Sequence, residues 1–403
     1  MRVLMVSDVY FPRVNGVSTA IETHRAGLAE HGVEVRLVVP RYDDEEDQPN
    51  ILRLPGWKVP GDPEDRIVSP LAMRRAAIEA ADGWADLIHV QTPFAAHYAG
   101  IAAAKRHGLP VVATYHTLFE EYLQLYAKRL PAAPLRALAR RISRMQCDSL
   151  TMTIVPSQAM LQRLREYGIR APLQVLPTGV PLGQFSVGDR QAQRARFRAR
   201  YGIPPSQPVA LFVGRAAHEK NIGFLIEALA LARQSCPDLL LLVAGEGPAL
   251  ADLHELAERL GQTANVRFLG YLDRARELPD CYAAADLFAF ASRTETQGLV
   301  LIEAMAAGLP VVALAEMGTC DLLSAGKGAL VPSLDTADFG AAMARVASDA
   351  LLRSRLGHEA QALAQDWSDS SLTARLAALY RELTPNSNAP ETAWRAHSRA
   401  RQA

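Results

Sequence analysis

Residues 287–313 read LFAFASRTETQGLVLIEAMAAGLPVVA. Two short apolar runs, Leu287–Phe290 and Val311–Ala313, flank a segment with the pattern of a helix. Short apolar runs bounded by turn residues are typical of strands that are buried on both faces. A strand, a helix and a second strand in this order predict two parallel strands joined by a right-handed crossover.

The same alternation extends along the chain in two series. Apolar runs that favour strands occur at Val3–Val6, Val33–Val39, Leu87–Val90, Val111–Thr114 and Met152–Val155, and again at Val209–Val213, Leu239–Ala244 and Val266–Phe268. Amphipathic stretches such as Ser18–His31 and Ala95–His107 separate them. We therefore predict an α/β protein with two Rossmann-like, doubly wound parallel-sheet domains facing a cleft.

The length of 403 residues supports this division, because one compact core rarely grows so large. The predicted first domain covers residues 1–187, and an Arg-rich stretch followed by Gly202-Ile203-Pro204-Pro205 predicts a linker over 188–205. The second domain covers 206–366, a helix covers 367–384, and a loose polar tail covers 385–403.

The composition excludes several classes of function. The chain has 43 basic and 43 acidic residues, so no global field favours coating of a nucleic acid. Its four cysteines are far apart and lack paired spacing, which argues against a disulfide framework and for a reducing compartment. Met1 leads directly into a strand-like run, and no apolar run reaches about 18 residues. We expect a cytoplasmic protein, or one that touches a membrane from that side.

Two carboxylates frame the start of the helix in the opening stretch. Glu295 precedes this helix and Glu303 lies within it, so they are separated by roughly 10 Å. A retaining glycosidase needs about 5 to 5.5 Å between its acids. The spacing instead suits the two ends of an elongated ligand, and Gly298 lets helix-start amides approach an anion such as a diphosphate. Alternatively, both glutamates are ordinary solvated or capping residues.

A second group of polar residues follows the strand Val209–Val213. Gly214 and Arg215 come first, and His218-Glu219-Lys220-Asn221 follows after two alanines. Arg215 can bind a phosphate through paired hydrogen bonds, and Lys220 can bind it as a compact charge. A solvated loop with ordinary charges is the alternative.

Together these motifs resemble the retaining glycosyltransferases of family 4, which have the GT-B fold. The resemblance spans nearly the whole chain. It implies that Arg215 and Lys220 bind a nucleotide diphosphate, that Glu295 contacts the donor sugar and that Glu303 holds the ribose. It also implies that the C-terminal helix returns to the first domain and that no metal or other cofactor is required.

Further segments match the same family. The segment Val266–Leu272 resembles its nucleobase cradle, the turn at Gly16 its phosphate-proximal loop, and His116 its histidine beside the donor sugar. Many members carry an aromatic residue where this chain has Gln297. The predicted catalytic residues are His116, Arg215, Lys220 and Glu295. The predicted donor-binding residues are Gly16, Gly214, Arg215, Lys220, Gly245, Tyr271, Leu272, Glu295, Gln297, Gly298, Leu299 and Glu303.

A basic segment points to the acceptor. Residues 128–170 hold nine basic and two acidic side chains, a local charge of 9 minus 2, or +7. The helix predicted around Arg129–Arg144 places apolar residues on one side and arginines on another, which favours an anionic membrane surface as a partner. Alternatively, this helix packs Leu135 and Leu138 into the first domain.

The stretch Tyr115–Tyr122 is especially similar to the family members that glucosylate diacylglycerol. This resemblance implies transfer of a hexose, glucose from UDP-glucose, to the hydroxyl of a lipid such as diacylglycerol at the inner face of the cell membrane. A GDP-mannose-dependent α-mannosyltransferase and a non-catalytic nucleotide-sugar-binding protein remain alternatives. A nicotinamide-dependent oxidoreductase is disfavoured because Gly-x-Gly-x-x-Gly does not follow the first strand.

Overall fold

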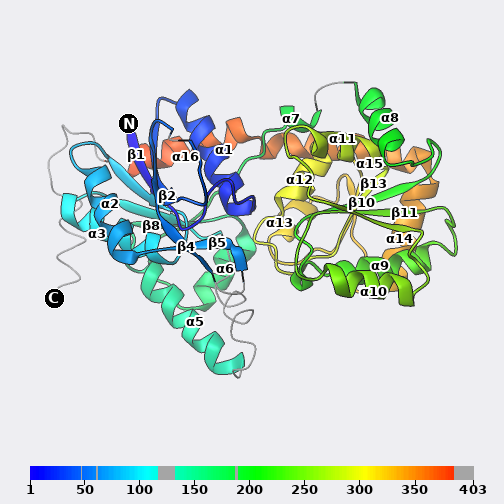
Figure 1. Ribbon diagram of the computed structural model, residues 1–403, viewed down its shortest axis with the longest axis horizontal. Helices are drawn as coiled ribbons and strands as arrows, with labels where there is room; N and C mark the ends of the chain where they lie inside the picture. Colours follow the sequence, from blue (N-terminus) through cyan, green and yellow to red (C-terminus); the bar gives the residue numbers. More distant parts are fainter. Residues whose placement is uncertain (47, 60–61, 117–131, 187–188, 385–403) are drawn as a thin grey trace.

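The computed structural model describes residues 1–46, 48–59, 62–116, 132–186 and 189–384. Two parallel sheets, one from each half of the chain, form the centres of two α/β domains (Figure 1). The two domains lie side by side, the first in blue to cyan and the second in green to orange. The prediction of two doubly wound domains is confirmed.

The sheet of the first domain has the strand order β3-β2-β1-β6-β7-β8-β9, and all its paired strands are parallel. Its strands are β1 (Arg2–Val6), β2 (Glu34–Pro40), β3 (Ile51–Leu54), β6 (Leu87–Val90), β7 (Val111–Thr114), β8 (Met152–Val155) and β9 (Leu173–Val175). Its helices are α1 (Gly16–Glu30), α2 (Pro70–Ala81), α3 (Ala95–His107), α5 (Ala132–Cys147) and α6 (Gln158–Glu166). An antiparallel hairpin, β4 (Gly56–Val59) and β5 (Asp62–Val68), stands apart from this sheet.

The sheet of the second domain has the order β12-β11-β10-β13-β14-β15 and is also parallel. Its strands are β10 (Val209–Val213), β11 (Leu240–Ala244), β12 (Val266–Gly270), β13 (Leu287–Phe290), β14 (Val311–Ala313) and β15 (Ala329–Leu330). Its α-helices are α7 (Gly183–Ser186), α8 (Arg190–Arg200), α9 (Ile222–Ala232), α10 (Leu250–Arg259), α11 (Glu277–Ala284), α12 (Leu299–Ala306), α13 (Thr319–Leu323), α14 (Thr336–Ser348) and α15 (Ala350–Ala364). Short 3-10 helices cover His218–Lys220 and Gln365–Trp367.

The predicted strands coincide with strands of these two sheets, and those that were missed lie at sheet edges or in the hairpin: β3, β9, β15, β4 and β5. Every residue of β10 and β13 is buried, so these strands appear in the sequence as apolar runs. In contrast, β3 and β4 bury few of their residues, and β15 has two residues. Strands that are this short or bury so few residues form only brief apolar runs, and the sequence pattern did not single them out.

The chain crosses between the domains earlier than the expected boundary at residue 187. Leu176 packs into the core of the first domain, whereas Val180 packs into the core of the second. Leu182 and Phe185 also belong to the second core. The change of core between residues 176 and 180 makes Pro177–Gly179 the first connection between the domains.

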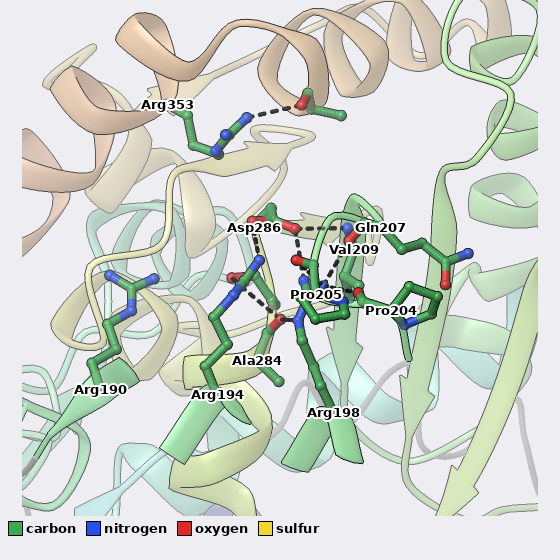
Figure 2. A network of polar contacts seen from close by, with 12 residues as sticks. Arg190, Arg194, Arg198, Pro204, Pro205, Gln207, Val209, Ala284, Asp286 and Arg353 are labelled. Atoms are coloured by element: carbon green, nitrogen blue, oxygen red, sulfur yellow. Dashed lines mark hydrogen bonds and ion pairs between the residues drawn. The ribbon is translucent and has the colours of Figure 1, made fainter. Parts of the chain in front are cut away.

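The segment expected as a linker over 188–205 contains helix α8, which packs on the second domain. Phe197 is buried in that core, and Arg194 and Arg198 each donate to the carboxylate of Asp286, at 2.9 and 3.0 Å (Figure 2). Arg198 also donates to the carbonyl oxygens of residues 204, 205 and 207, which fixes the turn before β10. An Arg-rich stretch resembles a polar linker in sequence, but buried carbonyls and one carboxylate can hold its guanidinium groups.

The last helix, α16 (Asp369–Leu383), returns to the first domain as expected (Figure 1). Leu372, Leu376 and Tyr380 pack into the core of that domain, and Tyr380 Oη lies 2.5 Å from His89 Nδ1 in β6. The return creates a second connection, which runs beside the first: Val180 N donates to Trp367 O, and Asp369 N donates to Val180 O, both at 3.0 Å. The predicted tail over 385–403 lies outside the described residues.

Candidate active site

The strand order of the second sheet reverses between the neighbouring strands β10 and β13. Strand β11 follows β10 on one side, whereas β13 lies on its other side, so the loops after β10 and β13 turn in opposite directions. In parallel α/β sheets, a ligand crevice forms at this switch point, beyond the carboxyl ends of the strands. The loop after β10 carries Lys220, and the loop after β13 carries Glu295.

Lys220 and Glu295 form an ion pair across this switch point. The Nζ atom of Lys220 donates to Glu295 Oε1 at 2.5 Å, and both side chains remain partly exposed, at 23% and 17%. Burial alone would lower the pKa of Lys220, but the Glu295 carboxylate raises it above its ordinary value. The ammonium is therefore charged at neutral pH and lies at the accessible edge of the sheet.

Glu303 is fully buried within α12, and its carboxylate binds two side chains from other elements. Arg274, in the loop after β12, forms an ion pair with Glu303, and Tyr282 Oη in α11 donates to Glu303 Oε2 at 2.9 Å. Burial and the carboxylate together raise the pKa of Tyr282. Burial acts to lower the pKa of Arg274, and Glu303 raises it. The sequence suggested Glu303 but gave no signal for Arg274 or Tyr282.

Arg215 and the loop after β11 complete the edge of the sheet. Arg215 is exposed, and its charge acts on Lys220, whose pKa it tends to lower. Gly245 has a φ of +142°, its N–H donates to Gly270 O at 2.8 Å, and a Cβ there would come within 1.9 Å of Gly214 O. The loops that begin at Gly214 and Gly245 are therefore packed backbone to backbone, as close as glycine allows.

The nucleobase segment and the start of α12 supply backbone groups. Tyr271 is 54% exposed, whereas the side chain of Leu272 is buried in the core, so Leu272 can offer a ligand its main chain. Gly298 adopts a left-handed φ of +86° and precedes Leu299, the first residue of α12. N–H groups in the first turn of a helix lack helical partners and can receive an anion.

The first domain contributes His116 and Gly16. His116 follows β7, its Nε2 lies 2.8 Å from Gln91 Oε1, and burial lowers its pKa to about 3, with a smaller contribution from His24. The imidazole is therefore neutral near pH 7, with its Nε2–H directed at Gln91. Gly16 begins α1 after the N-cap Asn15, and a Cβ at Gly16 would meet no atom within 4 Å.

Two residues between Glu295 and Gly298 contact the first connection and the first domain rather than the edge of the sheet. Thr296 Oγ1 donates to His116 O at 2.7 Å. Gln297 is buried, its Oε1 accepts from Thr178 N at 2.8 Å, and its Nε2 donates to Thr178 O at 2.6 Å. The side-chain amide of Gln297, predicted to bind the donor, is thus engaged with the connection between the domains. Sequence patterns gave no indication of the roles of Thr296 or Gln91.

Comparison with known proteins identifies the family of the chain. Residues 193–363 match the model of group 1 glycosyl transferases, and residues 14–184 match the model of Glycosyltransferase Family 4. The chain is 31% identical over 318 residues to the alpha-monoglucosyldiacylglycerol synthase of Acholeplasma laidlawii, covering 77% of this chain and 80% of that protein. It belongs to the family 4 glycosyltransferases.

Two further similarities extend this assignment. The glycosyltransferase is 33% identical to the alpha-monoglucosyldiacylglycerol synthase of Streptococcus pneumoniae, over 78% of this chain and 71% of that protein. Its fold matches that of Anabaena HepE, solved with UDP and glucose, with a TM-score of 0.75 and 20% identity, covering 94% of this chain and 98% of that one. The predicted family and the GT-B fold are both confirmed.

The basic helix is described in part. Arg129 lies outside the described residues, whereas α5 carries Arg136, Arg140, Arg141 and Arg144, which line a surface depression of about 630 Å³ with Ala137 and Tyr167. Leu138 and Met145 on the same helix are 50% and 59% exposed, so the alternative packing of the helix is wrong for Leu138, whereas Leu135 is half-buried. Among the described helices, none combines the length and the apolar character needed to span a bilayer.

Proposed function

We propose that this glycosyltransferase moves glucose from UDP-glucose to a hydroxyl of diacylglycerol at the inner face of the cell membrane, with retention of the anomeric configuration. The observation that carries the proposal is the ion pair between Lys220 and Glu295 at the switch point of the donor-side sheet. It places a cation suited to a diphosphate beside a carboxylate suited to sugar hydroxyls.

In the proposed complex, the pyrophosphate lies between the loop after β10 and the start of α12. Lys220 and Arg215 supply positive charge, and the amides after Gly298 supply hydrogen bonds. These groups stabilise the charge that develops on the diphosphate as the glycosidic bond breaks. Preorganised donors of this kind each contribute about 10²- to 10³-fold to the rate in enzymes.

The two carboxylates hold the ends of the donor by exchanging their present partners. Glu295 exchanges part of its contact with Lys220 for sugar hydroxyls, and Glu303 exchanges part of its contact with Arg274 or Tyr282 for the ribose. Each exchange replaces one hydrogen bond to the carboxylate with another. This replacement limits the free-energy cost of opening the ion pair that the carboxylate forms without a ligand. The neutral His116 contacts the sugar from the first domain without acting as a charged acid.

The acceptor hydroxyl attacks the anomeric carbon from the face that the diphosphate leaves. Its proton passes to the departing phosphate, so the C–O bond to the acceptor forms as the C–O bond to the phosphate breaks. This route requires no carboxylate nucleophile on the opposite face of the sugar. It agrees with the placement of Glu295 in an ion pair with Lys220 on the diphosphate-binding side.

Helix α5 supplies the proposed contact with the membrane. Leu138, Arg141 and Met145 are exposed and spaced by three or four residues, so they share one face of the helix. The helix projects from the body of the first domain (Figure 1). Basic residues near an anionic leaflet contribute about 1 kcal/mol each, and exposed apolar side chains can enter the interface beside them.

Product analysis with purified protein tests the proposal. The protein is incubated with labelled UDP-glucose and vesicles that contain diacylglycerol and an anionic phospholipid, and the lipid product is identified with its anomeric configuration by NMR. We expect an α-glucosyl diacylglycerol. Parallel reactions replace UDP-glucose with GDP-mannose, or the vesicles with soluble glycans. Transfer from GDP-mannose alone, or to soluble glycans alone, would replace the proposed donor or acceptor.

Two variants test whether transfer depends on the ammonium of Lys220. Lys220→Met removes the ammonium and should abolish transfer, whereas Lys105→Met removes an exposed lysine from α3 and should leave transfer unchanged. Binding of UDP-glucose without turnover by the wild-type protein would instead support a non-catalytic binding protein.

A further inference from the structure

Residues 291–298 connect β13 to α12, and we call this segment the donor loop. We infer that Thr296 and Gln297 are positioning residues that hold the donor loop of the second domain at a fixed position relative to His116 of the first. The kinetic part of this inference rests on the proposed function. Three hydrogen bonds of 2.6 to 2.8 Å carry it, and all come from two consecutive side chains between Glu295 and Gly298. The hydrogen bonds of these two side chains go to Thr178 and His116, not to Lys220 or Glu303, so we assign them a role different from that of the proposed donor-binding groups.

Thr296 connects the two sides of the cleft directly. Its hydroxyl donates to the main-chain oxygen of His116, while its own main chain continues from Glu295. The side chains of His116 and Glu295 are proposed to contact the same sugar from opposite domains. One hydrogen bond from the Thr296 side chain to the main chain of His116 therefore restrains the separation of these two groups, and reaction rates are sensitive to such placement.

Gln297 connects the same loop to the first connection between the domains, Pro177–Gly179, which we call the hinge. Its amide forms a paired contact with the main chain of Thr178, which lies between Leu176 in the first core and Val180 in the second. Two residues later, Val180 pairs with the returning connection at Trp367 and Asp369. A rotation of one domain relative to the other changes the main chain at this point, and Gln297 transmits the change to the donor loop.

The main chain of the donor loop also packs against Gly318 in the second domain. The loop therefore does not move with the first domain alone. Gly318 N donates to Glu295 O at 2.8 Å, and a Cβ at Gly318 would come within 2.0 Å of Thr296 O. This close packing ties the main chain of the loop to the second domain. The side chains of Thr296 and Gln297 then form the link from a stiff loop to the opposite domain and the hinge.

Matched substitutions test the link. Thr296→Val removes the hydroxyl with little change in shape, Thr296→Ser retains it, and Gln297→Met removes both hydrogen bonds to Thr178. Thr294→Val is the control, because it removes a hydroxyl from the same loop that forms no hydrogen bond with the described residues of the first domain. We expect Thr296→Val and Gln297→Met to lower kcat on the order of 10- to 100-fold, with an unchanged Kd for UDP in calorimetry and recovery of kcat in Thr296→Ser.

A second measurement does not depend on activity. Nitroxides are attached to Leu71→Cys in α2 and Leu351→Cys in α15, which are 76% and 85% exposed, in a background with Cys236→Ser and Cys320→Ser. We expect the interdomain distance distribution to broaden in Thr296→Val and Gln297→Met and to stay narrow in Thr294→Val. Because Gln297→Met also leaves Thr178 unpaired, the thermal unfolding midpoint is measured for each variant, and Thr296→Val provides the result if Gln297→Met does not fold.

The outcomes separate this inference from the proposed function. If wild-type protein turns over none of the nucleotide sugars, the proposed function fails. The distance distributions still show whether Thr296 and Gln297 restrain the relative position of the two domains. Unchanged distributions in Thr296→Val and Gln297→Met would overturn the inference. A loss of UDP binding in Thr296→Val as large as that in Lys220→Met would also overturn it, since the residue would then be a donor contact.

Discussion

The ammonium of Lys220 lies 2.5 Å from the carboxylate of Glu295, although 75 positions separate them in the chain. The pair bridges the loops that follow β10 and β13, where the strand order of the second sheet reverses. A bound diphosphate would compete with Glu295 for the same ammonium. Under the proposed function, donor binding is therefore an exchange of one anion for another at a preformed cation.

Neutralising Glu295 should separate binding from transfer. In Glu295→Gln, Lys220 loses its anionic partner and becomes available to the diphosphate, so UDP should bind at least as tightly as in the wild-type protein. Transfer should fall by about 10²-fold, because the carboxylate no longer holds the sugar. Calorimetry with UDP and a transfer assay measure the two effects. Weakening of UDP binding to the level of Lys220→Met would contradict the exchange.

Glu303 should contribute strongly to stability as well as to the site. Glu303→Gln leaves the partly buried guanidinium of Arg274 without its carboxylate, and breaking an ion pair that has a buried partner costs up to about 3 kcal/mol in free energy of unfolding. Tyr282→Phe removes one hydrogen bond to the same carboxylate and should cost about 1 kcal/mol. Urea unfolding of both variants checks this order, and equal costs would argue against an ion pair as the main interaction.

Gly245 should resist even a methyl group. Gly245→Ala would place a Cβ within 1.9 Å of Gly214 O, so the loops after β10 and β11 must separate, which should cost about 2 to 3 kcal/mol and weaken UDP binding. Gly261→Ala is the matched control, because Gly261 also has a positive φ but its Cβ would meet no atom within 4 Å. The control should cost about 1 kcal/mol and bind UDP normally. Similar UDP affinities in both variants would show that the close approach has no part in the site.

Stability should fall as the pH drops below about 6.5, in part because of His24. Burial lowers the pKa of His24 to about 4. Between about pH 6.5 and pH 4, the unfolded chain therefore binds a proton at His24 and the folded protein does not. The native state therefore loses about 1.4 kcal/mol per pH unit from this group as the pH falls through the interval. In His24→Leu, urea midpoints between pH 7 and about pH 5 should show a shallower slope. An unchanged slope would mean that His24 does not take part.

The arginines of α5 should control binding to anionic vesicles. Replacing Arg136, Arg140, Arg141 and Arg144 by glutamine removes four charges and should reduce the free energy of binding by about 4 kcal/mol at low salt. Vesicle sedimentation measures the change, and added salt should weaken wild-type binding in the same direction. The exposed Arg345 of α14 and Arg355 of α15, changed to glutamine, provide a control on the other domain. Equal loss in this control would assign the effect to total charge rather than to α5.

The sequence was sufficient for the elements that are buried throughout. Strands such as β10 and β13 lie between layers of helices, so each of their residues is apolar, and the run of apolar residues marks them directly. The sequence also pointed to Lys220 and Glu295, because each lies in the connection that follows such a strand. The connection between the domains could not be located, since helix α8 has the composition of a polar linker.

By itself, the sequence determined the two parallel sheets, the family and the loops that carry Arg215, Lys220, Glu295 and Glu303, because apolar periodicity and short motifs are local properties of the chain. Only the tertiary structure decided the partners of these residues. Arg274 and Tyr282 reach Glu303 from other elements, and Gln297 reaches Thr178 in the hinge. Such contacts depend on the packing of segments that are distant in sequence, and no local pattern records them.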